Sequence, residues 1–397
     1  MQSIQLKKNE QIIQQLEAKF DQYEEGFYFA SSDNRTVLYA FEATQSWHNW
    51  PTDFDSAELI VGGQAFQNFT GNDTVMSSFW FAPRIWAEFK AETISLHVPE
   101  EFDWQEWLSN VSTTVEKSAN SIVAVDDESD WIKRVEVLIQ KLNHDQNLDK
   151  VVFGRQRQIV LSKPLESSSL WQPLSAYTSN YRIVLKNKQR YFVSVTPERL
   201  LKVDLTGKLY TASLAGTAPR GEDEAEDAKL GSELMHSRKN RLEQDYVTRT
   251  IRKALGPYVK DLTVPFVPKL LKNRRVQHLY SPITAQLLEG QNPLKVLQKL
   301  HPTPALGGIP RQEALDYISE NECYPRGLFA GPIGYLKSDQ AGEFAVGIRS
   351  MMVADNRVRL FAGAGILAAS QAEAEYAETQ VKLEEMGKIL EEALQND

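Results

Sequence analysis

The fold of this chain is indicated most directly by the stretch Val358-Arg359-Leu360-Phe361-Ala362-Gly363-Ala364-Gly365-Ile366, an apolar run that ends in a glycine-rich turn. A helix is predicted to begin near Ser370 and to carry Glu375, Glu378 and Lys382 on one face, because steps of three and four residues align side chains on an α-helix. Two carboxylates can hold a hard divalent cation, and a lysine one turn later can meet an anion. Ion pairing on a solvated face explains the same spacing, so the helix alone leaves both interpretations open.

Composition limits the classes of function. The chain has 397 residues, of which 42% are hydrophobic and 24% are charged, and its formal net charge is -9. Nucleic-acid binding is not expected, since phosphate contacts need a basic surface. An anionic substrate would need a local cluster of positive charge. The glycine-rich nucleotide-binding motifs are absent from the sequence, so nucleotide binding of those kinds is not supported.

The cysteine content and the N-terminal residues bear on the compartment. A single cysteine, Cys323, excludes an internal disulfide framework and a zinc site built from several cysteines. Met1 to Lys8 lack the apolar stretch of a signal peptide. No run approaches the ~18 apolar residues of a membrane span. We therefore expect a protein of the cytoplasm that contacts neither membrane nor nucleic acid.

Hydrophobic periodicity predicts strands interrupted by helices. Residues 5–25 are expected to form an amphipathic helix, and residues 26–41 a hairpin around Ser31 to Asn34. Residues 110–128 are polar and are expected to form a surface loop, followed by a helix to about Asn143. Helices are also predicted at 223–256, 293–300 and 311–320, and strands at 150–161, 181–187, 190–196, 208–214, 328–336, 343–353 and 357–366. Adjacent hairpins favour an α+β class over regular βαβ alternation, in a single domain spanning residues 1–397.

Three glycine- and proline-rich segments precede the C-terminal helix. Prolines and glycines in Leu300–Arg311 fix an irregular backbone that can connect two helices or line a pocket. Small residues in Arg326–Tyr335 allow a ligand or another backbone to approach closely. In Gly342–Ser350 the alternation of a strand places Arg349 beside small residues, where its guanidinium can bind a carboxylate in bidentate fashion. A surface pair between Arg349 and Glu343 is the alternative.

These segments resemble the chorismate-utilising enzymes, the family of isochorismate, salicylate and anthranilate synthases and aminodeoxychorismate synthase. The resemblance covers about residues 145–395, in the family's order. Its further stretches are Ser194–Leu200, which resembles the family's Ser-Pro-Glu strand, Leu214–Gly221, which resembles its Ala-Gly-Thr loop, and Glu378-Thr379 with Lys382. The resemblance implies a single large domain of two packed, mostly antiparallel β-sheets with helices on the outside.

The resemblance also implies a Mg²⁺ site and a site for the dicarboxylate chorismate. Glu243 and Glu378 are expected to hold the metal ion, and Glu375 a metal-bound water. Arg349 and Lys382 are expected to bind carboxylate. The remaining expected substrate contacts are Ala215, Gly216, Thr217, His278, Ala305, Leu306, Gly363, Ala364 and Gly365.

One segment departs from the family's pattern. Where the family usually has Lys-Asp-x-x-Glu-His, this chain has Lys239, Asn240, Glu243 and Gln244. Glu243, the expected metal ligand, is kept. Asn240 stands where the family has an acid, and Gln244 stands where it has an ionisable side chain. The water shell of the metal is therefore expected to differ, although the amide oxygen of Asn240 can still accept from a metal-bound water.

The segment Leu148–Arg155 resembles the strand that carries the water-activating lysine of the family. This implies Lys150 as general base and Glu198 as general acid, in the addition of water at C2 of chorismate with loss of the C4 hydroxyl. Apolar Ala305 and Leu306 favour release of isochorismate over pyruvate loss. A salicylate synthase, a menaquinone-pathway enzyme and a non-catalytic anion- or metal-binding relative are the alternatives to an isochorismate synthase of catecholate siderophore synthesis. A monomer without a glutamine amidotransferase subunit is expected.

Overall fold

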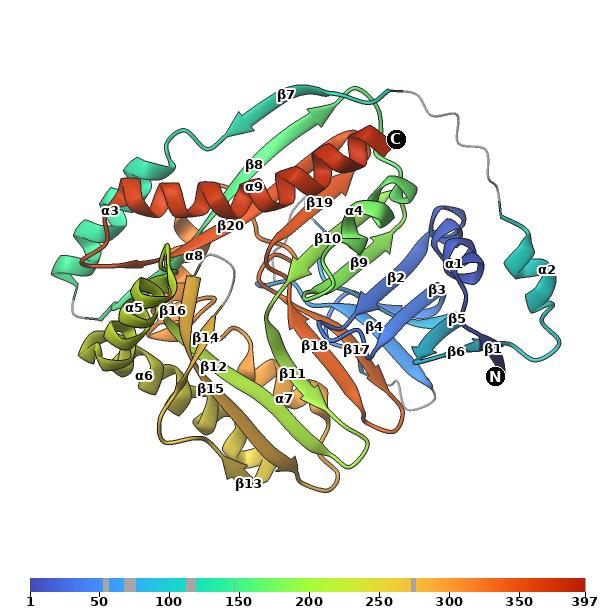
Figure 1. Ribbon diagram of the computed structural model, residues 1–397, viewed down its shortest axis with the longest axis horizontal. Helices are drawn as coiled ribbons and strands as arrows, with labels where there is room; N and C mark the ends of the chain where they lie inside the picture. Colours follow the sequence, from blue (N-terminus) through green and yellow to red (C-terminus); the bar gives the residue numbers. More distant parts are fainter. Residues whose placement is uncertain (53–56, 68–75, 112–118, 146, 273–275, 397) are drawn as a thin grey trace.

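Antiparallel strands dominate the fold (Figure 1). The computed structural model describes the chain except for residues 53–56, 68–75, 112–118, 146, 273–275 and 397. Within the described residues, 20 strands form one hydrogen-bonded network. The network has two arms that meet at β5 (Phe79–Lys90), because β5 pairs with β3 (Val37–Trp47) and also with β4 (Leu59–Gly63).

The first arm combines strands from both ends of the chain. From β3 it continues through β2 (Glu25–Ala30), β9 (Tyr181–Asn187), β10 (Arg190–Thr196), β19 (Ser350–Ala354), β20 (Arg357–Leu367), β8 (Lys150–Leu161) and β7 (Ile122–Asp127). Three short strands extend its edges: β6 (Thr93–Val98) pairs with β5, β1 (Gln2–Lys7) pairs with β6, and β16 (Gly308–Ile309) pairs with β8.

The second arm continues from β4 through strands of the central and C-terminal parts of the chain. These are β17 (Pro332–Lys337), β18 (Gly342–Val346), β11 (Arg199–Val203), β12 (Lys208–Pro219) and β15 (Val276–Leu287). Strands β13 (Val259–Thr263) and β14 (Lys269–Lys272) both pair with β15.

The two arms pack face to face across a large apolar core. In β2, Phe27 and Phe29 belong to this core, whereas Tyr28 and Ala30 belong to a second core on the outer face, as the period-two geometry of a strand requires. The ring centroids of Phe29 and Tyr335 lie 5.4 Å apart and join β2 of the first arm to β17 of the second. The outer core is closed by helices.

The helices lie on the outside of the sheets. Helices α1 (Glu10–Gln22), α4 (Trp171–Ser175) and α9 (Ala372–Asn396) contribute to the outer core of the first arm. Figure 1 shows α9 running across β20 and β8, with α3 (Trp131–His144) beside its N-terminal end. Helices α5 (Glu224–His236) and α6 (Arg238–Leu255) pack on β12. The remaining α-helices are α2 (Trp104–Ser109), α7 (Pro293–Leu300) and α8 (Arg311–Asn321), and short 3₁₀ turns lie at Ser167–Leu170 and Gly256–Tyr258.

The predicted α+β class, the antiparallel pairing and the external helices are confirmed. The two packed sheets are present as arms, although β5 makes their hydrogen bonding continuous. Within the described residues, no helix is long and apolar enough to cross a membrane.

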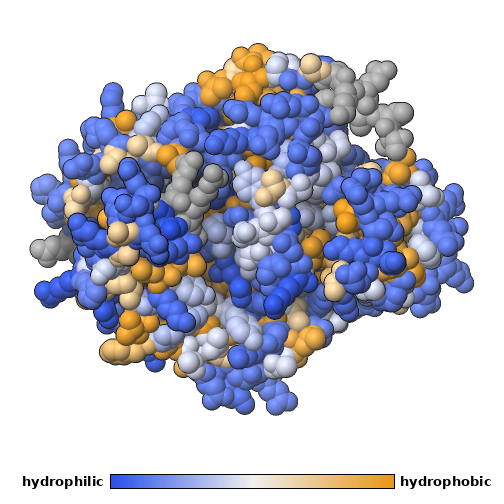
Figure 2. Space-filling model, in the orientation of Figure 1, coloured by the Kyte–Doolittle hydropathy of each residue, from blue (hydrophilic) through white to orange (hydrophobic). Residues whose placement is uncertain are grey.

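Several local predictions were wrong. Gly363–Ile366, expected to form a turn, continue strand β20 and pair with β8. The strand expected at 343–353 is interrupted, since β18 ends at Val346 and β19 begins at Ser350. The predicted helix 5–25 begins only at Glu10, because residues 2–7 form β1 through pairing with β6. Part of the predicted loop 110–128 is strand β7, which pairs with β8, while residues 112–118 lie outside the described part. For β1 and β7, a partner distant in sequence overrides a weak local signal. Figure 2 shows an apolar patch at the top, where β7 exposes Ile122, Val123 and Val125.

Candidate active site

The ladder between β8 and β20 positions Lys150 over the glycine-rich segment. Gly363 is opposite Gly154, Gly365 is opposite Val152, and Leu367 is opposite Lys150. A Cβ atom at Gly365 would lie 2.9 Å from Cε of Lys150, closer than side-chain carbons normally approach. The glycine therefore gives the lysine side chain room to extend across the sheet.

Lys150 is paired with the first of the expected metal ligands. Its Nζ donates to Oε1 of Glu243 at 2.6 Å. The two side chains are 11% and 19% exposed, so the pair is mostly withdrawn from water but reachable from the surface. Glu243 lies on α6, whose first turn is capped by Ser237. The predicted base and the predicted metal ligand thus lie in direct contact.

Helix α9 is fixed to β8 by a buried arginine. Arg155 is fully buried and donates to Thr379 at 3.1 Å and to Asp127 of β7 at 2.6 Å. Its guanidinium also lies 3.7 Å from the ring centroid of Tyr376. These contacts set the rotation of α9, so that the face with Glu375, Glu378 and Lys382 is presented away from the apolar stripe.

The C-terminal lysine contacts the glycine segment directly. Nζ of Lys382 donates to the carbonyl of Gly363 at 2.8 Å and to Oε1 of Glu378 at 2.6 Å. One turn earlier, Glu375 accepts a hydrogen bond from Ser370 at 2.7 Å. Burial raises the pKa of Glu375, and the negative charge of Glu378 adds to that rise. The carboxylates of Glu375 and Glu378 therefore repel each other electrostatically on one side of α9.

His278 links the second arm to this group. It lies opposite Thr217 in the β12–β15 ladder, and the backbone of Gly216 hydrogen-bonds to it. Burial lowers the pKa of His278, and the positive charges of Lys382 and Arg349 lower it further. Charges from α9 and from the segment after β18 thus act on a histidine of β15.

The Ala-Gly-Thr loop is an irregularity in β12. The register of the ladder shifts between Ala215 and Thr217, and Gly216 has a φ of +72°, which favours glycine. A Cβ at Gly216 would lie 3.0 Å from Cβ of Asn240. Ala215 is buried, while the side chain of Thr217 lies outside the described part.

Arg349 faces α9. It has a φ of +47° after the end of β18, and its carbonyl accepts from Val195 at 2.9 Å. Its guanidinium forms an ion pair with Glu385. The alternative partner Glu343 is buried and is engaged instead by Lys202 at 3.0 Å and by Arg199 at 3.5 Å. The alternative of a surface pair between Arg349 and Glu343 was therefore wrong, and Arg349 lies between β18 and β19 rather than within a strand.

Glu198 lies next to the same backbone segment. Its carbonyl accepts from Val346 at 3.0 Å and its N–H donates to Oγ1 of Thr196 at 3.2 Å. Among the described residues, its carboxyl group has no hydrogen bond or ion pair. Burial alone raises the pKa of Glu198 to about 7. A carboxyl group of this kind is partly protonated at neutral pH and can donate a proton.

The proline-rich loop closes against β8. Ile309 pairs with Lys150, and a Cβ at Gly308 would collide with the carbonyl of Lys150. Leu306 is buried and Ala305 is half-buried. The carbonyl of Leu306 accepts from Nη1 of Arg326 at 3.0 Å. The backbone carrying the predicted base is thus held by the loop that carries two predicted substrate contacts.

Comparison with known proteins identifies the family. A family model described as chorismate binding enzyme matches residues 2–391. The chain belongs to the chorismate-binding enzymes. It is 39% identical over 261 residues to isochorismate synthase MenF of Bacillus subtilis, covering 66% of this chain and 55% of that protein.

Two further comparisons define the extent of the likeness. The chain is 39% identical over 245 residues to the salicylate biosynthesis isochorismate synthase of Pseudomonas aeruginosa, covering 61% of this chain and 50% of that protein. It spans about half the length of these curated relatives. The solved structure of the menaquinone-specific isochorismate synthase MenF of Escherichia coli matches with a TM-score of 0.82, 23% identity, and coverage of 98% and 94% of the two chains. That match supports the fold.

The three residues expected at the metal site are Glu243, Glu375 and Glu378. Their carboxylate oxygens are the kind of ligand that a hard cation prefers. In the structure Glu243 is paired with Lys150, and Glu378 with Lys382. Two lysines therefore offset the negative charge of these acids. Gln244, where the family usually has an ionisable group, donates instead to Ser213 and Ser281 at 3.1 and 2.9 Å and so joins α6 to β12 and β15.

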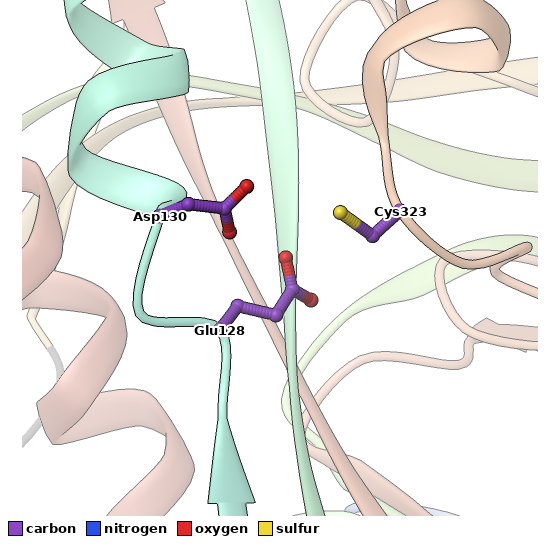
Figure 3. A group of neighbouring side chains, drawn as sticks. All are labelled: Glu128, Asp130 and Cys323. Atoms are coloured by element: carbon purple, nitrogen blue, oxygen red, sulfur yellow. The ribbon is translucent and has the colours of Figure 1, made fainter.

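A different group of potential metal ligands lies elsewhere. Figure 3 shows Glu128, Asp130 and Cys323 pointing toward one another. Each of the three offers one possible ligand atom, and these atoms lie within 4.8 Å of one another. Arg134 forms ion pairs with both carboxylates and supplies the cation at this point. Within the described residues the acids of the family's metal site do not form such a compact group.

The sequence pattern missed two neighbours of the site. Glu385, the partner of Arg349, lies three residues after Lys382 and so on the same face of α9, a spacing that was available from the sequence. Lys239 acts on Glu375 by its positive charge and lowers the pKa that burial raises. Its position four residues before Glu243 gave no hint of this contact with a helix far along the chain.

Proposed function

We propose that this chain is an isochorismate synthase that converts chorismate to isochorismate. The similarity to relatives named as isochorismate synthases in two bacteria supports the proposal. The observation that carries it is Glu198: burial raises the pKa of its carboxyl group to about 7, and its backbone carbonyl accepts from Val346, in the segment that leads to Arg349. A proton donor is what the loss of a hydroxyl group from the ring requires.

The reaction needs two proton transfers. Lys150 takes a proton from a water molecule as its oxygen bonds to C2, the ring double bonds shift, and the C4–oxygen bond breaks. Glu198 gives its proton to the departing hydroxyl, which leaves as water. The added and lost water molecules balance, so substrate and product are isomers. In the structure Nζ of Lys150 donates to Glu243, so this hydrogen bond must break before Nζ can accept a proton from water.

The substrate carboxylates are bound by the two cations next to α9. Arg349 offers a planar fork for one carboxylate, and Lys382 offers a point charge at the carbonyl of Gly363. Both cations are paired with acids in the structure, with Glu385 and Glu378. Substrate therefore exchanges one carboxylate partner for another, which limits the desolvation cost of binding.

Magnesium completes the proposed site. Glu243 and Glu378 would hold the ion, with Glu375 one turn before Glu378 as a further carboxylate near it. When bound, the ion supplies positive charge for the ring carboxylate that the acidic surroundings lack. Support comes from the three carboxylates, from the electrostatic coupling of Glu375 to Glu378, and from the two lysines that neutralise them in the structure.

We also propose that the protein works as a monomer without a glutamine amidotransferase subunit, since a lysine that activates water replaces the need for ammonia. Size-exclusion chromatography with light scattering would test the monomer. The roles in siderophore synthesis and in the cytoplasm stay predictions from the sequence.

Product analysis tests the function. The purified protein is incubated with chorismate and Mg²⁺, and the products are separated by chromatography. Isochorismate without pyruvate is expected, because apolar Leu306 and small Ala305 offer no polar group to assist pyruvate elimination. Salicylate together with pyruvate would show a salicylate synthase instead. An absence of turnover at saturating chorismate and Mg²⁺ would overturn the proposed activity.

A further inference from the structure

Helix α9 carries one acid whose part in the site is explained by neither the proposed metal nor the proposed reaction. Glu385 lies three residues after Lys382, so it is on the same face of the helix. Its carboxylate forms an ion pair with Arg349, which lies between β18 and β19. The cation expected to bind a substrate carboxylate is therefore already engaged by a carboxylate of the protein.

Arg349 is anchored by its backbone, so a change of partner has to come from its side chain. The carbonyl of Arg349 accepts from Val195 at 2.9 Å, and strand β19 begins at the next residue. The positive charge of Arg349 also lowers the pKa of His278, an expected substrate contact on β15. The guanidinium thus lies within electrostatic range of both Glu385 and the candidate substrate site.

Glu385 and a substrate carboxylate would both draw on the single positive charge of Arg349. A guanidinium that faces one carboxylate attracts a second one much less, and two carboxylates at one guanidinium repel each other. A carboxylate that binds at Arg349 therefore has to displace Glu385 or is bound more weakly in its presence.

The ion pair is weak enough for a substrate to displace. The side chains of Arg349 and Glu385 are 29% and 31% exposed, and ion pairs in contact with water contribute little to stability. Such a pair is expected to be closed about one to five times as often as it is open. The apparent affinity of a ligand falls in proportion to the fraction of sites that are free to bind it. Loss of Glu385 should therefore raise that affinity by about twofold to sixfold.

We propose that Glu385 is a built-in competitor for the substrate carboxylate at Arg349 and sets the affinity of the candidate site for its substrate. The inference rests on the proposed function only for the role of Arg349 as a carboxylate ligand. Arg349 and Lys382 are separate cations, so the class of ligand affected is a small dicarboxylate. A ligand held at a second point rebinds Arg349 as an intramolecular event, which lets it compete with the tethered carboxylate of Glu385.

The probe is fluoroterephthalate, a planar dicarboxylate that the proposed reaction cannot convert. It is titrated into the full chain with Mg²⁺ and followed by fluorine NMR. Glu385→Gln removes the charge and keeps the size of the side chain, and we expect it to tighten binding by about twofold to sixfold. Glu384→Gln, the same change at the exposed neighbouring position, should leave binding unchanged.

A double-mutant cycle separates competition at Arg349 from a general effect of charge. Arg349→Gln alone should weaken binding. Adding Glu385→Gln to it should give no further change, because there is no longer a guanidinium to compete for. A general loss of negative charge would instead tighten binding with or without Arg349. Circular dichroism of each variant checks that the helices are intact.

The proposal is overturned if Glu385→Gln binds the probe no more tightly than the natural protein, or if Glu384→Gln gives an equal gain. It is also overturned if the gain persists in the Arg349→Gln background, or if no variant shows saturable binding up to about 10 mM. The measurement needs no turnover. A protein that fails to convert chorismate but gains affinity in Glu385→Gln would contradict the proposed function and support this inference.

Discussion

Replacing Glu198 by glutamine should stabilise the protein at neutral and alkaline pH while removing most of its activity. Burial raises the pKa of Glu198 from 4.5 to about 7. A carboxyl group whose pKa is raised on folding stabilises the fold fully only below the unfolded value, and this contribution is lost as pH rises through the folded value. Ionisation of Glu198 therefore lowers the free energy of unfolding by up to about 3 kcal/mol at pH 8 but by less than about 1 kcal/mol at pH 5.

Glutamine has the same shape and no ionisation, so Glu198→Gln avoids this cost. Thermal unfolding should show a Tm higher than that of the natural protein by roughly 4 °C at pH 8, with the difference shrinking toward pH 5. Glutamine cannot give a proton to the departing hydroxyl, so turnover of chorismate should fall by about a hundredfold or more.

Glu17 provides a matched control. Glu17 lies on α1, which packs on the outer core of the first arm and carries none of the candidate site residues. Burial raises its pKa to about 7 as well. Glu17→Gln should therefore show the same pH-dependent gain in Tm without loss of turnover. The reasoning about Glu198 is refuted if Glu198→Gln keeps near-native turnover, or if its Tm difference is the same at pH 5 and pH 8.

Four further substitutions test the other parts of the site. Lys150→Ala should leave the fold intact by circular dichroism and lower water addition by about a hundredfold or more, whereas near-native turnover would remove Lys150 from the role of base. Glu378→Ala should weaken the dependence of turnover on Mg²⁺, and an unchanged Mg²⁺ titration would count against Glu378 as a ligand. Gly365→Ala should lower turnover more than Gly363→Ala, because the added Cβ meets Lys150 at 2.9 Å in the first case and finds no atom closer than 3.4 Å in the second; equal effects would contradict the packing of Lys150 over Gly365.

The sequence predicted well wherever the signal was local. The hairpin around Ser31 to Asn34 and the helix beginning near Asp130 follow from periodicity and turn residues, and both are present as β2–β3 and α3. The face of α9 with Glu375, Glu378 and Lys382 follows from helical spacing, and its opposite stripe is buried. Local geometry of this kind needs no knowledge of the partner segment.

What the sequence could not predict depends on pairing between distant segments. Lys150 meets Glu243 across 93 residues, and nothing local to either residue indicates the contact. Strand β1 exists because β6 offers a partner. The buried Arg155, which orients α9 through Thr379, is followed by the polar residues Gln156, Arg157 and Gln158, and nothing in this local sequence indicates that it is buried. Such contacts are set by the assembly of the two arms rather than by propensity.

The central claim is that water, rather than the substrate's own hydroxyl group, supplies the new oxygen at C2. It is tested most directly by running the reaction in water enriched in oxygen-18 and analysing the isochorismate by mass spectrometry. The account predicts one atom of oxygen-18 in the product, at the C2 hydroxyl. Isochorismate without the label would contradict the addition of water, and with it the role of Lys150 as the base that activates it.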